Sequence, residues 1–242
     1  MEIIGPSLTL RYATPADAPA LLELGSDARV TRFFSWGPYT SIEQPSAYIE
    51  GLAGERARGE RLDLVIVSHG APIDSEGPTA SGRRHPIDSA GPTASGRGHP
   101  IGVTGLTEFN RRDRRAVVGT WLGSAYWGTG ANRESKALIA HLAFRVLGLE
   151  RLGAYADLDN PRSQRALERI GFEREGVLRH WHRHGSDVHD VLVYSWLKGE
   201  WACSPLADTE VEVHGAPPPA FMVVPPRETE TTAPLSPAAS PS

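Results

Sequence analysis

The stretch Ala125–Phe144, AYWGTGANRESKALIAHLAF, places a glycine-bracketed turn, Trp127–Asn132, directly before an amphipathic helix. A strand-like run, Val117–Leu122, precedes the turn. Apolar side chains after the turn recur at i, i+3, i+4 and i+7, which predicts one buried helix face. These side chains are Ile139, Leu142, Ala143 and Val146, and Gly148 follows as the stop. The sequence therefore predicts a strand, a turn and a helix in succession.

A turn of this kind is suited to bind an anion. The N–H groups of a first helical turn lack intrahelical acceptors, and the helix dipole makes that end positive. Glycines let the backbone approach a phosphate closely, and Arg133 adds a charge at the mouth. The spacing is neither a Walker loop, because no GK[ST] follows, nor G-x-G-x-x-G. A plain β–α turn is therefore the alternative interpretation of these residues alone.

Composition is that of an ordinary globular protein, with 242 residues, 40% hydrophobic and 22% charged. That length allows one domain with extensions or two small domains. A net charge of −4 gives no indication of nucleic-acid binding. The single cysteine, Cys203, excludes an internal disulfide and fits a reducing compartment. Neither a membrane-spanning run nor a signal-peptide pattern is present, so we expect a cytoplasmic protein with no membrane partner.

Two helices and an aromatic loop are predicted near the N-terminus. A strand at Leu8–Tyr12 precedes a helix that Thr14 and Pro15 open. A second helix runs from about Ser41 to Arg58. The loop between them, Phe33–Tyr39, either walls a substrate pocket or covers the core.

A tandem duplication separates the strands predicted at Leu62–Val67 and Ile101–Phe109. Its copies, Ile73–Pro86 and Ile87–Pro100, differ at two positions and are rich in Gly, Pro and Ser. Such a segment buries too little apolar surface to offset its ordering entropy. We expect a flexible insertion at about residues 70–100, at a hairpin tip, where added length costs little.

The second half of the chain alternates strands and helices and ends in a polar segment. We predict strands Arg115–Leu122, Arg151–Asp157, Phe172–His184 and His189–Lys198, and a helix from Asn160 to Gly171. This order predicts an α+β fold with a mixed sheet, in a domain over residues 1–201. Residues 202–242 are rich in Pro, Ala and Ser, which predicts a disordered tail, although its apolar patch Ala220–Val224 is a candidate docking segment.

Two motifs resemble the GNAT superfamily of acetyl-CoA-dependent N-acetyltransferases, with the closest likeness to the ribosomal-protein N-terminal acetyltransferase subgroup. Tyr126–Glu134, YWGTGANRE, is similar to the family's pyrophosphate loop R/Q-x-x-G-x-G/A. Asp159–Phe172, DNPRSQRALERIGF, is similar to its pattern N-x-x-S/A followed about two helical turns later by G-F, and lies about 30 residues further on. The likeness spans roughly Leu8–Trp201 without the repeat. It implies a mixed, mostly antiparallel sheet that is splayed at the cofactor site and flanked by helices.

The resemblance also implies an acetyl-CoA site, and no metal. Acetyl-CoA would lie between the strands Val117–Leu122 and Arg151–Asp157, with its pantetheine arm paired to backbone near Trp121 and Leu122. The residues implied to hold the pyrophosphate are Gly128, Thr129, Gly130, Ala131, Asn132 and Arg133. Asn160 would bind the pantetheine, or serve only as a helix N-cap.

The implied chemistry is direct attack of an amine on the thioester, which requires a neutral amine and a proton for the thiolate. Ser163 is the implied general acid, because the tyrosine common in the family is Leu167 here; its alternative role is a bond to backbone. The glutamate common before the loop is Val117 here. Glu108 is then the candidate general base, unless the amine loses its proton to water.

Histidines at 180, 182 and 184 alternate along a predicted strand and should share one face. Without a carboxylate or cysteine in the pattern, they more often form a polar strand face than a metal site or a substrate wall. Cys203 has no base partner in its pattern, so we do not expect a catalytic thiol.

We therefore expect an acetyl-CoA-dependent N-acetyltransferase that acts on a primary amine, either a protein N-terminus or a small amine, with a homodimer as one option. The rival is a non-catalytic acyl-CoA-binding sensor or scaffold on the same fold, which the absent glutamate favours. A nucleotide-binding fold is a third interpretation, but the expected Lys and ribose-binding acid are missing.

Overall fold

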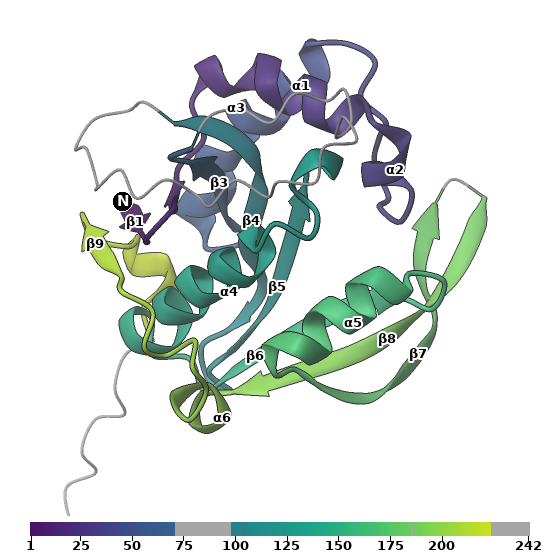
Figure 1. Cartoon of the computed structure of the whole chain (residues 1–242). Coiled ribbons are helices and arrows are strands. Elements are labelled where there is room, and N and C mark those ends of the chain that lie inside the picture. Colours follow the sequence, from purple (N-terminus) through teal and green to yellow (C-terminus); the bar gives the residue numbers. More distant parts are fainter. Residues whose placement is uncertain (71–97, 185, 224–242) are drawn as a thin grey trace, which may run out of the picture.

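The computed structural model describes residues 1–70, 98–184 and 186–223. Within these residues a nine-stranded sheet runs in the order β7-β8-β6-β5-β4-β3-β2-β1-β9 (Figure 1). The strands are β1 (Glu2–Ile4), β2 (Leu8–Arg11), β3 (Leu62–Ser68), β4 (His99–Asn110), β5 (Arg115–Leu122), β6 (Arg151–Asp157), β7 (Glu173–His184), β8 (Asp187–Leu197) and β9 (Glu212–His214). The predicted α+β fold is confirmed, and β1 and β9 extend the sheet beyond the prediction.

Helices cover both faces of the sheet (Figure 1). They are α1 (Ala18–Ser26), α2 (Ala28–Thr31), α3 (Glu43–Arg58), α4 (Ala131–His141), α5 (Pro161–Ile170) and α6 (Lys198–Ala202). On one face, α4 and the π-helix Leu142–Val146 that continues it form the main core. On the other face, α1 and α3 pack against Val103 and Trp121. No helix in the described part of the chain is long and apolar enough to cross a membrane.

The centre of the sheet is splayed between β5 and β6. These two strands are parallel, whereas the other neighbouring pairs are antiparallel. Their pairing is short: Arg115–Val117 of β5 pair with Arg151–Gly153 of β6. Beyond that point β5 stays paired to β4 as far as Leu122, and β6 stays paired to β8 as far as Asp157. The two strands therefore diverge at their carboxyl ends, and each leaves one backbone edge free (Figure 1).

The predicted insertion connects the strands of a hairpin, because β3 and β4 pair as far as Ser68 and His99. Residues 71–97, most of the repeat, lie outside the described residues. The last two residues of the second copy, His99 and Pro100, are not part of a loop but begin β4.

The prediction of disorder from residue 202 onward is wrong for the described part of that segment. Strand β9 pairs with β1, and Leu206 and Phe221 are buried. Phe221 packs edge-on against Phe109, with ring centroids 4.7 Å apart, and the N–H of Val223 donates to the carbonyl of Leu147 at 3.1 Å. The apolar patch thus docks on its own domain, because a few apolar side chains in a polar segment are enough to bury it. Residues 224–242 lie outside the described residues.

Candidate active site

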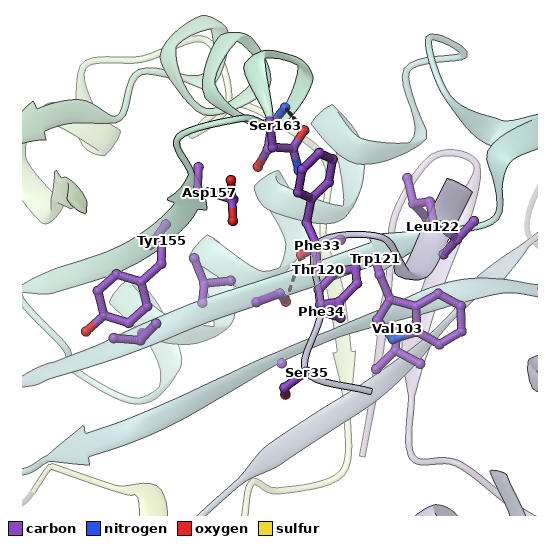
Figure 2. Close-up of a pocket in the computed structure, with 18 of the residues that line it drawn as sticks. Phe33, Phe34, Ser35, Val103, Thr120, Trp121, Leu122, Tyr155, Asp157 and Ser163 are labelled. Atoms are coloured by element: carbon purple, nitrogen blue, oxygen red, sulfur yellow. Dashed lines mark hydrogen bonds between the residues drawn. The ribbon is translucent and has the colours of Figure 1, made fainter. Parts of the chain in front are cut away.

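A cavity of about 840 Å³ lies at the splay, lined by both diverging strands (Figure 2). Its wall also includes the glycine turn, the first turns of α4 and α5, and the aromatic loop after α2. Of the residues predicted to bind cofactor or to act in catalysis, Glu108, Trp121, Leu122, Gly128, Asn132, Asn160 and Ser163 line it. Thr129, Gly130, Ala131 and Arg133 complete the turn but are not among its lining residues.

The glycine turn has a backbone that requires glycine. Gly128 has φ +78°, and Gly130, the N-cap of α4, has φ +100°. A Cβ at either position would meet nothing within 4 Å, so conformation rather than space excludes larger residues. Thr129 Oγ1 donates to the carbonyl of Tyr126 at 2.9 Å. The turn thereby places the N-terminus of α4 at the mouth of the splay, where the N–H of Ala131 makes a long contact of 3.4 Å to Thr129 Oγ1.

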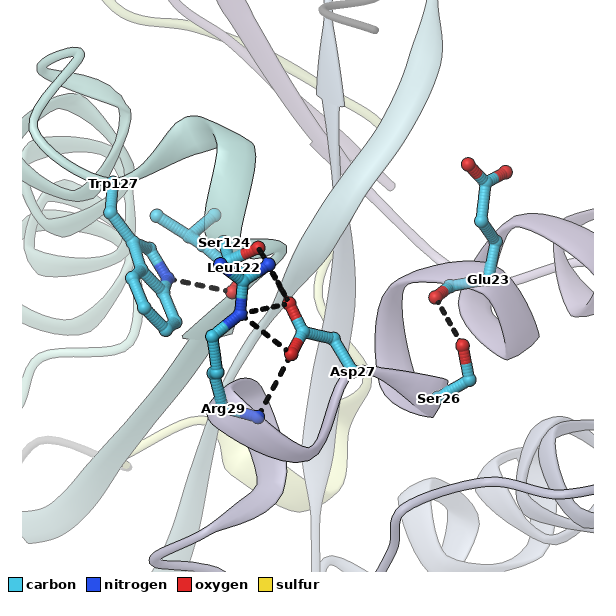
Figure 3. A network of polar contacts seen from close by, with 7 residues as sticks. All are labelled: Glu23, Ser26, Asp27, Arg29, Leu122, Ser124 and Trp127. Atoms are coloured by element: carbon cyan, nitrogen blue, oxygen red, sulfur yellow. Dashed lines mark hydrogen bonds and ion pairs between the residues drawn. The ribbon is translucent and has the colours of Figure 1, made fainter. Parts of the chain in front are cut away.

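Two sets of contacts hold the turn in place. Trp127 Nε1 donates to the carbonyl of Leu122 at 2.9 Å, and the Arg162 guanidinium lies 3.2 Å from the centre of the Trp127 ring. Asp27 accepts from Ser124 Oγ at 2.6 Å and pairs with Arg29, so α2 is tied to the residues just before the turn (Figure 3). The hydrogen bond from Arg29 lowers the pKa of the Asp27 carboxyl, and burial opposes it.

The first turn of α5 brings Asn160 and Ser163 to the cavity. Asn160 Oδ1 accepts from the N–H of Ser163 at 3.1 Å, which confirms the predicted N-cap. The cap uses the oxygen of Asn160 and the backbone of Ser163, so the Asn160 Nδ2 and the Ser163 hydroxyl are the groups left for a ligand. Leu167, which stands at the position where the resembled family commonly has a tyrosine, is buried.

Glu108 stands at an irregular point of β4, with φ +50° and a register shift against β5. Its Oε2 accepts from Tyr155 Oη at 3.1 Å, and both side chains line the cavity. Burial, and then the nearby Glu108, raises the pKa of Tyr155. Sequence reasoning missed Tyr155, although the alternation of β6 places it on the same face as Asp157.

Aromatic side chains form the wall opposite the strands. The members that line the cavity are Phe33, Phe34, Trp36 and Tyr39. Trp36 packs against Phe34 (5.4 Å between centroids), Tyr39 (4.9 Å) and Trp121 of β5 (5.3 Å). The loop therefore forms part of the cavity wall, and its contact with a substrate stays a prediction (Figure 2).

A buried carboxylate, Asp63, also lines the cavity. Sequence patterns did not identify it. Asp63, Gly105 and Gly119 are paired in register across β3, β4 and β5, so they share a face. A Cβ on Gly105 would come within 2.0 Å of Asp63 Oδ1, so the carboxylate leans over that glycine. Asp63 accepts from Tyr48 Oη at 2.6 Å and lies 3.2 Å from Arg61 Nε. Burial raises its pKa, with Arg61 and Tyr48 acting in the opposite direction.

The histidines of β7 do not form one regular face. The register of β7 shifts between Leu178 and His182, and His180 has φ +55°. His182 lines the cavity, and its ring lies 4.8 Å from that of His184. In the part of the chain that the structure describes, no three His, Cys, Asp or Glu side chains are grouped as metal ligands.

Comparison with known proteins gives concordant matches. The acetyltransferase (GNAT) domain family matches residues 7–173. The uncharacterised N-acetyltransferase YoaA of Bacillus subtilis (strain 168) is 29% identical over 193 residues, which cover 79% of this chain and 93% of that protein.

Two solved structures with bound ligands share the fold. RimL, a ribosomal L7/L12 alpha-N-protein acetyltransferase in complex with coenzyme A, has a TM-score of 0.62 at 23% identity, over 81% of this chain and 98% of that chain. Spermidine N-acetyltransferase from Vibrio cholerae, in complex with CoA and spermine, has a TM-score of 0.60 at 18% identity, over 80% and 97%. At these identities the two structures show a common fold.

Proposed function

Because this chain belongs to the GNAT acetyltransferase family, we propose that it transfers the acetyl group of acetyl-CoA to a primary amine, either a protein N-terminus or a small amine. The observation that carries this proposal is the splay after Val117 and Gly153, with the glycine turn at its mouth. A strand edge left free inside a cavity can pair with an extended amide chain, and pantetheine is such a chain.

The cofactor end follows from the same geometry. The N–H groups of Gly128–Asn132 bind the pyrophosphate at the N-terminus of α4, and Arg133 adds a charge nearby. Backbone of Trp121 and Leu122 pairs with the pantetheine arm, with the Leu122 carbonyl also accepting from Trp127 Nε1, and Asn160 Nδ2 donates to the arm from the opposite side of the splay. The structures of RimL with coenzyme A and of the spermidine enzyme with CoA support this assignment by their fold.

The acceptor end favours a cationic amine. The cavity there contains the carboxylate of Glu108, the carboxyl of Asp63 with its partner Arg61, and the aromatic wall formed by Phe34, Trp36 and Tyr39. Carboxylates and aromatic faces both attract an ammonium group. RimL acts on a protein amine and the spermidine enzyme on a polyamine, so the fold accepts both kinds of acceptor that we propose.

The transfer needs a proton acceptor for the amine and a donor for the departing thiolate. We assign the first role to Glu108, which is held by Tyr155 at the acceptor side. We assign the second to the Ser163 hydroxyl, which faces the cavity from α5.

Calorimetric titration with acetyl-CoA tests the cofactor site. We expect binding to the wild type and at least tenfold weaker binding to Gly130→Val. A β-branched residue would let the free turn relax away from φ +100°, and binding would then have to restore that conformation at a cost of about 1–3 kcal/mol. Gly51→Ala, on the helix α3 and with open space around its Cβ, is the matched control and should bind like the wild type. No binding by the wild type, or equal binding by Gly130→Val, would contradict the proposal.

Thiol release from acetyl-CoA, measured across a panel of small amines and N-terminal peptides, tests the acceptor. We expect release with at least one member that carries a primary amine. Tight acetyl-CoA binding with no release from any member would instead support a role as an acyl-CoA sensor.

A further inference from the structure

Lys136 is a buried lysine on the side of the cavity that our proposed function gives to acetyl-CoA. It lies on α4, five residues after the helix begins at Ala131, and only 4% of its surface is exposed. It faces the sheet, where the neighbouring helix residues Ala137 and Leu138 are apolar and fully buried. Proteins ordinarily have an apolar residue at such a position. Burial of the lysine amine costs free energy that packing of its side chain does not offset.

The amine of Lys136 has few partners. Its Nζ donates to Thr120 Oγ1 on β5, and Thr120 Oγ1 lies 2.6 Å from Thr104 Oγ1 on β4. Among the described residues, Lys136 forms no ion pair. An ammonium group has three donors, and a buried cation without a counter-charge is strongly unfavourable. The cavity that Lys136 lines is the place from which a negative partner can come.

The position of Lys136 along the splay indicates which part of acetyl-CoA it meets. With the pyrophosphate on the glycine turn, the pantetheine arm passes Leu122 and then Trp121 along the edge of β5. Thr120 is the next residue toward the point where the splay closes, at Val117 and Gly153. Three residues of strand span roughly 10 Å, so the arm would present its sulfur end near Thr120.

We propose that Lys136 is a further catalytic residue of acetyl transfer, and that its ammonium group binds the sulfur of acetyl-CoA and stabilises the thiolate. The acceptor nitrogen forms a bond to the acetyl carbon and gives its proton to Glu108. The C–S bond breaks with its electron pair on sulfur, and the thiolate takes a proton from Lys136 Nζ. Lys136 regains a proton from solvent when CoA leaves. This inference rests on the proposed acetyl-CoA site.

The chemistry of the two groups is matched. Burial lowers the pKa of Lys136 to about 7, and the thiol of a cysteine, taken as a guide to that of CoA, has a pKa of about 8.5. A proton donor with a pKa close to the working pH is the efficient kind. A serine hydroxyl is a weaker acid than this ammonium group, so Lys136 takes over the proton-donor role assigned above to Ser163. Ser163 keeps a hydrogen bond that orients the thiolate.

The pKa of the thiol in bound CoA is the direct test, measured by the ultraviolet absorbance of the thiolate. We expect bound CoA to titrate at least one unit below free CoA in the wild type, and no lower than free CoA in Lys136→Met. Lys136→Arg should keep part of the shift. Desulfo-CoA, which lacks the sulfur, should bind the wild type and Lys136→Met with equal affinity. In the transfer assay, Lys136→Met should lower kcat at least tenfold and leave the KM for the acceptor unchanged.

The outcomes separate this inference from the proposed function. Absence of CoA binding to the wild type would contradict the acetyl-CoA site itself. CoA binding with the same thiol pKa in wild type and Lys136→Met would overturn the role of Lys136 and leave the site intact. An isolated charge costs more to bury than an apolar side chain, so Lys136→Met should fold. Lys136→Gln, which keeps a donor without a charge, is the second variant for the same measurement.

Discussion

Asn160 illustrates, at the scale of one residue, how a structural role and a binding role can be separated. Its oxygen caps α5 and only its amide nitrogen is left for acetyl-CoA. Asn160→Ser keeps a good capping oxygen and removes the amide, so stability should change by no more than about 0.5 kcal/mol. Acetyl-CoA affinity should fall severalfold, measured by calorimetry. Asn160→Ala should lose about 1 kcal/mol of stability as well. Unchanged affinity in Asn160→Ser would show that Asn160 is a cap alone.

Glu108 is the proposed proton acceptor for the attacking amine. Glu108→Gln keeps the size of the side chain and a hydrogen-bond acceptor for Tyr155 but cannot take up a proton. General-base catalysis contributes about 10²–10⁴ in rate, so kcat should fall by at least 100-fold. Tyr155→Phe removes the hydrogen bond to Glu108 and should have a smaller effect. If steady-state kinetics show Glu108→Gln within twofold of the wild type, then the amine loses its proton to water.

At the scale of elements, Asp17 joins β2 to the start of α1. It is 3% exposed, accepts from Arg11 at 2.7 and 2.8 Å, and accepts from the N–H of Thr14 at 2.7 Å. The Arg11 side chain is 24% exposed, so the pair is only partly buried, and loss of these charged hydrogen bonds should cost about 1.5–3 kcal/mol in denaturant unfolding of Asp17→Ala at pH 7. Asp113→Ala is the control, because this exposed carboxylate has surface ion pairs worth less than about 1 kcal/mol.

The same pair should make stability depend on pH. Burial by itself would raise the pKa of Asp17, but Arg11 and Thr14 together lower it below its ordinary value of 3.8. A carboxyl whose pKa is lower in the folded state stabilises the fold above its unfolded pKa, and that contribution disappears as the pH falls through the folded pKa. The stability difference between wild type and Asp17→Ala should therefore be constant from pH 7 to 5 and shrink below pH 3.8. A constant difference down to pH 2 would contradict this assignment.

For the whole molecule, local sequence patterns predicted most helices and strands, but they predicted only some of the residues that line the cavity. The helix α5 was predictable because its cap, its apolar spacing and its stop at Gly171 are all local. Glu108 and Ser163 were likewise found from short motifs. Asp63 and Tyr155 were not, because they reach the cavity only through the register of β3 and β6 with strands that lie far away in sequence. Lys136 was overlooked, although it lies three residues before Ile139 and so continues the predicted apolar face of the helix.

The C-terminal segment up to Val223 was also not predicted correctly, because its contacts are with residues far away in sequence. A substitution in it tests the stability of the whole fold. Phe221 is fully buried against Phe109, and Arg111 donates to the carbonyl of Ala220, so the segment covers the core next to the β4–β5 hairpin. Phe221→Ala leaves a cavity and should cost about 3–5 kcal/mol in denaturant unfolding. Glu210→Ala, on an exposed part of the same segment, should change stability by less than about 0.5 kcal/mol. Acetyl-CoA affinity of Phe221→Ala below its unfolding transition should match the wild type, because Phe221 does not line the cavity. Wild-type stability in Phe221→Ala would mean that this segment adds nothing to the core and that composition alone had described it correctly.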